Sequence, residues 1–299
     1  MGNLFDKEAA SCLLNNLKKE YDIFAPKRYP GDGAYSDTDT IRYGIIESFE
    51  EIIWDRKSDY SFKEALLPIS DTIMYFTQSS TKLPEPRKKR LLFLRSCDIH
   101  ALKRLDEIYL KNGFSDYYYQ SVRENAKFVL MGCADSFNSC FCVSMGTNQT
   151  DSYDAYAYPE TNGLYFEFNN EDLKTAAKAS EAPEKSFPKR FVTVNEEQVC
   201  PPENLPENIG QHELWKEYSG RCIGCGRCNF VCPTCTCFTM QDIFYRDNEN
   251  AGERRRVWAS CQVDGYSDIA GGMSFRKDQG ERMRSRRPSG LRKTRVSYN

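Results

Sequence analysis

The sequence has little net charge and no long apolar run. Its formal net charge at pH 7 is -2 over 299 residues, so the overall charge gives no reason to expect nucleic-acid or membrane partners. No stretch approaches the roughly 18 apolar residues that a membrane-spanning helix needs. The N-terminus also lacks the basic start and apolar core of a secretory signal. We therefore expect a cytoplasmic protein.

Histidine is scarce as well, and glycine-rich nucleotide-binding motifs are missing from the sequence. With only two histidines in the chain, a Ser–His or Cys–His hydrolase is not expected. No G-x-G-x-x-G follows a strand-like run and no Walker loop is present, so nucleotide binding by this chain is not expected either. The sequence gives no sign of a substrate site of its own.

The first 200 residues alternate between helical and extended patterns. Residues 6–20 carry an apolar stripe at helical spacing, and residues 72–76 form a short extended run. The continuous apolar runs 91–94 and 128–131 indicate buried strands, with a helical pattern between them. This order predicts an α/β or α+β scaffold domain over residues 1–200.

The rest of the chain changes character twice. Residues 201–214 contain several Pro, Glu and Asn residues and are predicted to be a linker. Residues 215–284 contain seven of the thirteen cysteines and are predicted to be a ferredoxin-type iron–sulfur module. Residues 285–299 are basic with few core-forming residues, which predicts a disordered tail.

Thirteen cysteines are present, and six of them lie between positions 222 and 237. In a reducing compartment such crowding indicates metal binding rather than disulfides. The pattern C-x2-C-x2-C-x3-C-P is that of bacterial ferredoxins, which bind [4Fe–4S] clusters. Its four predicted ligands are Cys222, Cys225, Cys228 and Cys232.

The spacing of this run suits an iron–sulfur cube. Two-residue gaps let one tight loop direct three thiolates at one cluster, and Gly224 and Gly226 allow the backbone to approach its sulfides. The alternative is a zinc site, since zinc also takes four thiolates. Zinc modules, however, usually pair two C-x2-C knuckles across a longer gap.

The cysteine run does not by itself determine the complete set of cluster ligands. In two-cluster ferredoxins its fourth cysteine binds the other cluster, so Cys232 would reach a second cluster and the first would need another thiolate. The chain contains no second run, and Cys261 is its only cysteine after Cys237. Cys235 and Cys237 are possible further ligands, spare thiols or packed residues.

A second group of cysteines lies in the N-terminal half. Cys97 follows one predicted buried strand and Cys133 follows the other, with Cys140 and Cys142 close behind. If the two strands are neighbours, all four thiols could meet at one edge of the sheet as a metal or cluster site. The alternative is that they are small buried hydrophobic residues.

Four segments together resemble a known family. They are Tyr21–Lys27, Arg95–Asp106, Asn138–Thr147 and Cys222–Phe238. The sequence resembles the iron–sulfur subunit of anaerobic sulfite reductase, within a wider group of iron–sulfur β-type subunits of hydrogenases and sulfur reductases. The resemblance runs from about residue 5 to about residue 284.

The resemblance implies electron relay. A flavoprotein subunit would take electrons from NADH, this chain would pass them on, and a sirohaem subunit would reduce sulfite to sulfide. Subunits of this family end with a second C-x2-C-x2-C-x3-C-P run and hold two clusters. This sequence departs from that pattern near residue 285. We therefore expect a truncated or frame-shifted chain with one complete cluster or none.

Three alternatives stay open. The chain could be a β-type subunit of a sulfur-reducing hydrogenase. From another class, it could be a zinc-stabilised interaction module. The departure at the C-terminus also leaves a non-functional fragment as an alternative.

Overall fold

The computed structural model describes residues 1–200, 202 and 206–284. The predicted basic tail at 285–299 lies outside the described residues, as does part of the predicted linker at 201–214. The described residues form two compact units. Unit 1 comprises residues 1–67 and 85–198, and unit 2 comprises residues 68–84 together with the described residues from 199 onward.

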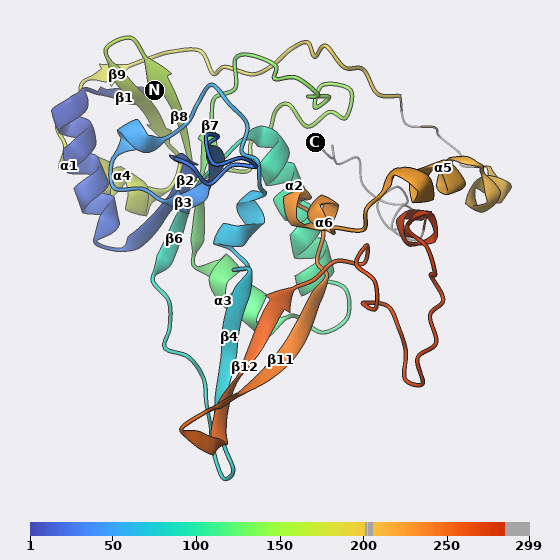
Figure 1. The fold of residues 1–299 in the computed structure, drawn as a ribbon. Helices are drawn as coiled ribbons and strands as arrows, with labels where there is room; N and C mark the ends of the chain where they lie inside the picture. Colours follow the sequence, from blue (N-terminus) through green and yellow to red (C-terminus); the bar gives the residue numbers. More distant parts are fainter. Residues whose placement is uncertain (201, 203–205, 285–299) are drawn as a thin grey trace. The chain divides into compact units, whose positions relative to one another are not determined.

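Unit 1 is built on an eight-stranded sheet (Figure 1). In spatial order its strands are β10 (Glu184–Lys185), β1 (Gly2–Phe5), β9 (Gly163–Phe168), β8 (Ala155–Glu160), β7 (Ala126–Met131), β6 (Lys89–Leu94), β2 (Tyr21–Tyr29) and β3 (Thr40–Ile45). The four central strands β8, β7, β6 and β2 are parallel to one another, and the outer pairs are antiparallel. The predicted α/β class of the N-terminal region is confirmed.

Helices cover both faces of this sheet (Figure 1). They are α1 (Lys7–Lys18), α2 (Ser96–Leu110), α3 (Tyr117–Glu124) and α4 (Glu171–Lys178), with short 3-10 turns at Phe49–Glu51 and Phe62–Ala65. Leu91 and Phe93 belong to the apolar cluster under α1 and α4. Leu92 and Leu94 alternate with them and are equally buried. Burial on both faces explains why β6 is a continuous apolar run rather than an alternating one.

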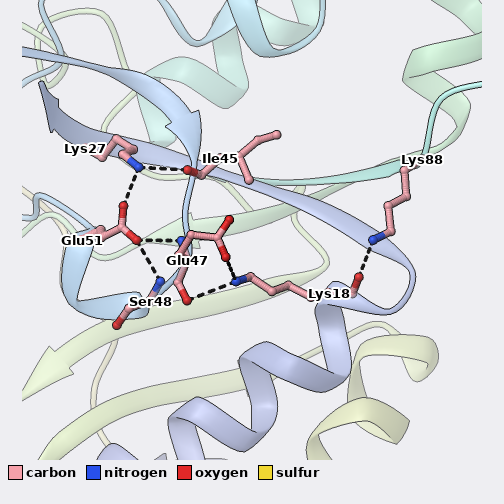
Figure 2. Close-up of polar contacts among 7 residues, drawn as sticks. All are labelled: Lys18, Lys27, Ile45, Glu47, Ser48, Glu51 and Lys88. Carbon is pink, nitrogen blue, oxygen red and sulfur yellow. Dashed lines mark hydrogen bonds and ion pairs between the residues drawn. The ribbon is translucent and has the colours of Figure 1, made fainter.

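Lysine and glutamate side chains join α1 to the end of β3 (Figure 2). The Lys18 ammonium donates to the Glu47 carbonyl at 3.1 Å and pairs with the Glu47 carboxylate. Glu51 accepts from the backbone N–H groups of Glu47 and Ser48 at 2.7 and 3.0 Å. Lys27, which lies on β2, forms an ion pair with Glu51. These contacts hold the segment that follows β3 against α1 and β2.

Unit 2 has its own sheet of four antiparallel strands. In spatial order they are β11 (Phe238–Tyr245), β12 (Asn248–Trp258), β4 (Ser70–Thr77) and β5 (Thr81–Lys82). Its helical segments are a 3-10 turn at Glu207–Gln211, α5 (Leu214–Arg221) and α6 (Arg227–Val231).

The division into units differs in one place from the boundaries that the sequence predicts. Residues 68–84 fall within the range expected for the N-terminal domain, yet β4 pairs along its length with β12. For example, Phe76 is the register partner of Gly252. A pairing between strands so far apart in sequence leaves no local signal, because each strand only shows that it is extended.

No helix among the described residues is both long enough and apolar enough to cross a membrane.

Candidate iron–sulfur centre

The cysteine run begins directly after α5 and extends through α6 of unit 2, so that Cys228 lies on α6 and Cys232 follows it. Helix α5 ends at Arg221, and the backbone N–H of the next residue, Cys222, donates to the Tyr218 carbonyl at 3.0 Å. Gly224 and Gly226 both have left-handed backbone conformations, with φ of 69° and 76°. Gly226 is the residue immediately before α6. The two glycines therefore turn the chain sharply within the run, as the spacing predicts.

Close packing also requires glycine at position 226. A β-carbon built there would lie 2.7 Å from the β-carbon of Ser260. Ser260 and Gln262, which follow β12, are buried, and the Gln262 carbonyl accepts from the Arg282 guanidinium at 3.3 Å. The loop of the run is thus pressed against a second, well-anchored segment of unit 2.

The four predicted ligands differ in exposure. Cys225 is exposed, Cys222 and Cys228 are half-buried, and Cys232 is buried. Cys232 caps the end of α6 and its sulfur lies 3.4 Å from the Thr234 hydroxyl. A graded exposure of this kind leaves one side of the loop open to solvent and closes the other.

The sulfurs do not converge in this structure. Among the described residues, no group of three or more histidine, cysteine, aspartate or glutamate side chains is placed so that it could hold a metal ion. What fits an iron–sulfur cluster is the donor chemistry of four soft thiols and the tight glycine-containing loop that carries them. The individual ligands therefore stay predictions.

Asn229 joins the run to two cysteines beyond it. This buried side chain lies with its amide nitrogen 3.4 Å from the Cys237 sulfur and 3.5 Å from the Cys261 sulfur. Its amide oxygen lies 3.6 Å from the sulfur of Cys228. Cys235 is half-buried, and its backbone N–H donates to the Cys232 carbonyl at 3.4 Å.

Cys237 and Cys261 form a close pair. The pKa of Cys237 is raised well above its usual value, first because its thiol shares a hydrogen bond with Cys261 and then because it is buried. The sequence indicates that both are cysteines but gives no reason to pair them, since a whole β-hairpin separates them. Asn229 carries no sequence signal beyond its position next to Cys228.

The second cysteine group lies in unit 1. The strands that precede Cys97 and Cys133 are neighbours, because β6 and β7 pair in parallel. Cys97 and Cys133 are half-buried, whereas Cys140 and Cys142 are buried. The two strands are therefore neighbours, which is the condition that the sequence hypothesis set. The described side chains here are not arranged as a metal-holding group either.

Comparison with known protein families supports the iron–sulfur interpretation of unit 2. The family described as a 4Fe-4S dicluster domain matches residues 221–298. The match begins at the predicted run, so the prediction of a [4Fe–4S] cofactor is confirmed. The description names two clusters, whereas the sequence contains one C-x2-C-x2-C-x3-C-P run.

A curated relative extends the similarity over most of the chain. Sulfhydrogenase 2 subunit beta of Pyrococcus furiosus is 28% identical over 296 residues, covering 92% of this chain and 83% of the relative. No solved structure matches the chain.

These two findings support the resemblance only at the level of the wider group. They support similarity to the wider group of iron–sulfur β-type subunits and do not specifically support the iron–sulfur subunit of anaerobic sulfite reductase. They also support partner subunits in general, because the relative is a subunit of a larger complex. The chain is thus similar to an iron–sulfur subunit of an oxidoreductase complex.

Proposed function

We propose that this chain is the electron-carrying, iron–sulfur β-type subunit of a sulfur-reducing hydrogenase complex. The observation that carries the proposal is the combination of two similarities: the 4Fe-4S dicluster domain at residues 221–298, and the β subunit of a sulfhydrogenase over nearly the whole chain. The chain's role is to accept and pass single electrons.

The ligand assignment follows from the loop. Cys222, Cys225 and Cys228 would hold one [4Fe–4S] cluster, since they share the tight turn made by the two left-handed glycines. Cys232, which lies at the far end of α6, would reach a second cluster, as the fourth cysteine does in two-cluster ferredoxins. When bound, such a cluster exchanges one electron at a potential set by hydrogen bonds and solvent exposure.

The residues around the run suit that role. The backbone N–H groups of the loop are the donors that tune sulfide charge in such sites, and the exposed Cys225 marks the open side of the loop. Buried Ser260 and Gln262 support the loop from behind. This side of unit 2 combines a solvent-accessible thiol with a rigid backing, which is what electron exchange with a partner protein needs.

Anaerobic reconstitution with ferrous iron and sulfide tests the proposal. We expect a brown protein whose visible absorbance bleaches with dithionite, and we expect Cys225→Ala to lose most of the iron held by the run. Cys12→Ser is the matched control, because Cys12 is exposed on α1 and far from the run in sequence. A colourless protein that retains zinc but no iron would contradict the proposal and favour the zinc-stabilised module. Binding of neither metal would favour the non-functional fragment.

The iron–sulfur subunit of an anaerobic sulfite reductase is the second candidate. The observation that favours it is the motif set quoted above, above all Asn138–Thr147 with Cys222–Phe238. In that case the partners would be an NADH-oxidising flavoprotein and a sirohaem subunit. Isolation of the intact complex under anaerobic conditions separates the two candidates. Clusters that are reduced by hydrogen support the hydrogenase, whereas sirohaem absorbance with sulfite-dependent reoxidation supports the sulfite reductase.

A further inference from the structure

Cys237 and Cys261 lie beside the hairpin that β11 and β12 form (Figure 1). Phe238 and Trp258 are register partners at its open end, and the Ala259 backbone N–H donates to the Cys237 carbonyl at 3.0 Å. Cys237 immediately precedes β11, and Cys261 is the third residue after β12. The pairing of the two strands therefore brings together two cysteines that lie far apart in the sequence.

A single buried amide contacts both sulfurs. Only 2% of Asn229 is exposed, and its amide nitrogen lies 3.4 Å from the Cys237 sulfur and 3.5 Å from the Cys261 sulfur. The two thiols also share a hydrogen bond with each other. Thiols in direct contact can reach disulfide geometry by turning about their side-chain bonds, while the backbone stays in place.

The backbone that carries Cys261 is firmly anchored. The residues on either side of it, Ser260 and Gln262, are both buried, and the Gln262 N–H donates to the Ser260 hydroxyl at 3.1 Å. The Gln262 carbonyl accepts from the Arg282 guanidinium at 3.3 Å. Anchoring of this kind keeps one thiol next to the other and so favours a reaction between them over a reaction with a free thiol.

Polar donors surround the two sulfurs. Besides Asn229, the Gln262 amide nitrogen lies 3.8 Å from the Cys261 sulfur, and the Tyr266 hydroxyl shares a hydrogen bond with Cys237. Disulfides form through attack by a thiolate, and hydrogen bonds donated to a thiolate stabilise its charge. Both cysteines are half-buried rather than fully enclosed, so part of each residue is open to a small reagent.

We propose that Cys237 and Cys261 form a redox-active dithiol, which closes to a disulfide when it meets an oxidant of the disulfide class and reopens on reduction. One thiolate attacks the oxidant, whose S–S bond breaks, so that a mixed disulfide forms and one half leaves as a thiol. The second cysteine then attacks the sulfur of its partner and releases the other half. The two cysteines lose two electrons and two protons, and the two released thiols carry them.

The pair is separate from the cysteine run that the iron–sulfur interpretation uses. Both residues lie outside the C-x2-C-x2-C-x3-C-P pattern, and a disulfide needs only two thiols, whereas an iron–sulfur cluster or a structural zinc ion takes four ligands. The inference therefore requires no iron and does not depend on the proposed function.

Asn229 connects the pair to the run. It lies on α6, and its amide oxygen is 3.6 Å from the Cys228 sulfur while its amide nitrogen faces the pair. Closing the disulfide changes both sulfur partners of that nitrogen at once. The redox state of the pair thus acts on a residue in contact with a predicted cluster ligand.

Oxidised glutathione is the probe that tests the proposal. The full-length chain, both iron-free and after anaerobic reconstitution with iron and sulfide, is treated with it, alkylated in acid and digested. We expect mass spectrometry to find a Cys237–Cys261 cross-link in most chains, and dithiothreitol to reverse it. Cys261→Ser should instead retain a glutathione adduct on Cys237. Cys12→Ser and Cys200→Ser, both at exposed positions, are the controls and should form the cross-link normally, as should Cys235→Ser.

Three results would overturn the inference: no Cys237–Cys261 cross-link in the unaltered chain, a cross-link from either residue mainly to a cysteine of the run, or protection of either thiol from alkylation by bound iron, which would make it a cluster ligand. The unaltered chain decides the question even where a serine variant fails to fold. Failure of the proposed function gives a different pattern, since a chain that binds no iron should still form the cross-link.

Discussion

Gly226 shows how one residue controls the shape of the cysteine run. It combines a left-handed backbone, with φ of 76°, and a close approach to Ser260. Gly265 has a nearly identical φ of 78° but nothing within 4 Å of its missing β-carbon. Substituting each glycine in turn therefore separates the free-energy cost of backbone strain from the free-energy cost of crowding.

We predict that Gly226→Ala destabilises unit 2 more than Gly265→Ala does. The left-handed conformation costs an L-residue about 1–2 kcal/mol in both variants, and overpacking against Ser260 adds about 1–3 kcal/mol at position 226 alone. Urea unfolding followed by tryptophan fluorescence in a Trp54→Phe background, which leaves Trp215 and Trp258 of unit 2, measures the difference. Equal losses in the two variants would show that the close approach does not matter.

Tyr156 on β8 links stability to pH. Its hydroxyl accepts from the Arg190 backbone N–H at 2.9 Å, and burial raises its pKa to about 12 from 10.0. An unfolded tyrosine loses its proton near pH 10, so the unfolded state binds fewer protons than the folded state between about pH 10 and 12. The contribution of Tyr156 to stability is therefore complete below about pH 10 and is lost as pH rises towards about 12.

We predict that this loss amounts to about 1–2 kcal/mol, after allowance for partial screening by solvent. Urea midpoints measured between about pH 9 and about pH 12 should fall less steeply for Tyr156→Phe than for the unaltered chain, although the variant starts lower because the Arg190 N–H loses its acceptor. Parallel profiles would exclude Tyr156 as a source of the pH dependence.

At the scale of elements, β12 depends on a strand from far away in the sequence. It pairs with β11 on one side and β4 on the other. The Thr72 hydroxyl on β4 donates to the Glu253 carboxylate on β12 at 2.6 Å. That hydrogen bond is the largest cause of the lowered pKa of Glu253. Without β4, the remaining β11–β12 hairpin would be only marginally stable, as isolated hairpins are in water.

We predict that replacing residues 70–82 with a Gly-Ser segment of equal length exposes β12. Amide hydrogen exchange across Asn248–Trp258 should become at least about tenfold faster, because the hairpin then opens at little cost. The amides of β6 in unit 1 serve as the internal control and should be unchanged. Unaltered exchange in β12 would mean that β4 is not needed to hold it.

The sequence predicts the elements of unit 1 well but not how distant segments meet. The apolar runs at 91–94 and 128–131 lie within β6 and β7, because strands buried on both faces are built mainly from apolar residues. The run at 72–76 lies within β4, yet its place in unit 2 depends on hydrogen bonds to β12. Those bonds join backbone groups, which almost every residue carries alike, so side-chain identity does not reveal them.

At the scale of the whole molecule, the two cysteine groups belong to different units. The run that begins at Cys222 lies in unit 2, and the group around Cys97 and Cys133 lies in unit 1. Each unit has its own sheet, so each group is positioned by a different scaffold. The positions of the two cysteine groups are therefore set independently, each by the packing of its own unit.

The chemistry of the run is determined by sequence alone. The spacing of Cys222, Cys225, Cys228 and Cys232 limits how far apart the thiols can be, and glycine is the residue that adopts the left-handed turns between them without strain. Local constraints of this kind need no knowledge of the rest of the fold, which is why the family match begins at the same place.

Only the tertiary structure decided which distant residues share a site. The pairing of β6 with β7 brings Cys97 and Cys133 to one edge, and Asn229 meets Cys237 and Cys261 across the hairpin. The sequence positions of these thiols do not indicate which of them lie close together in the fold. Strand order and register place them, and both are set by packing and backbone hydrogen bonds over the whole of each unit.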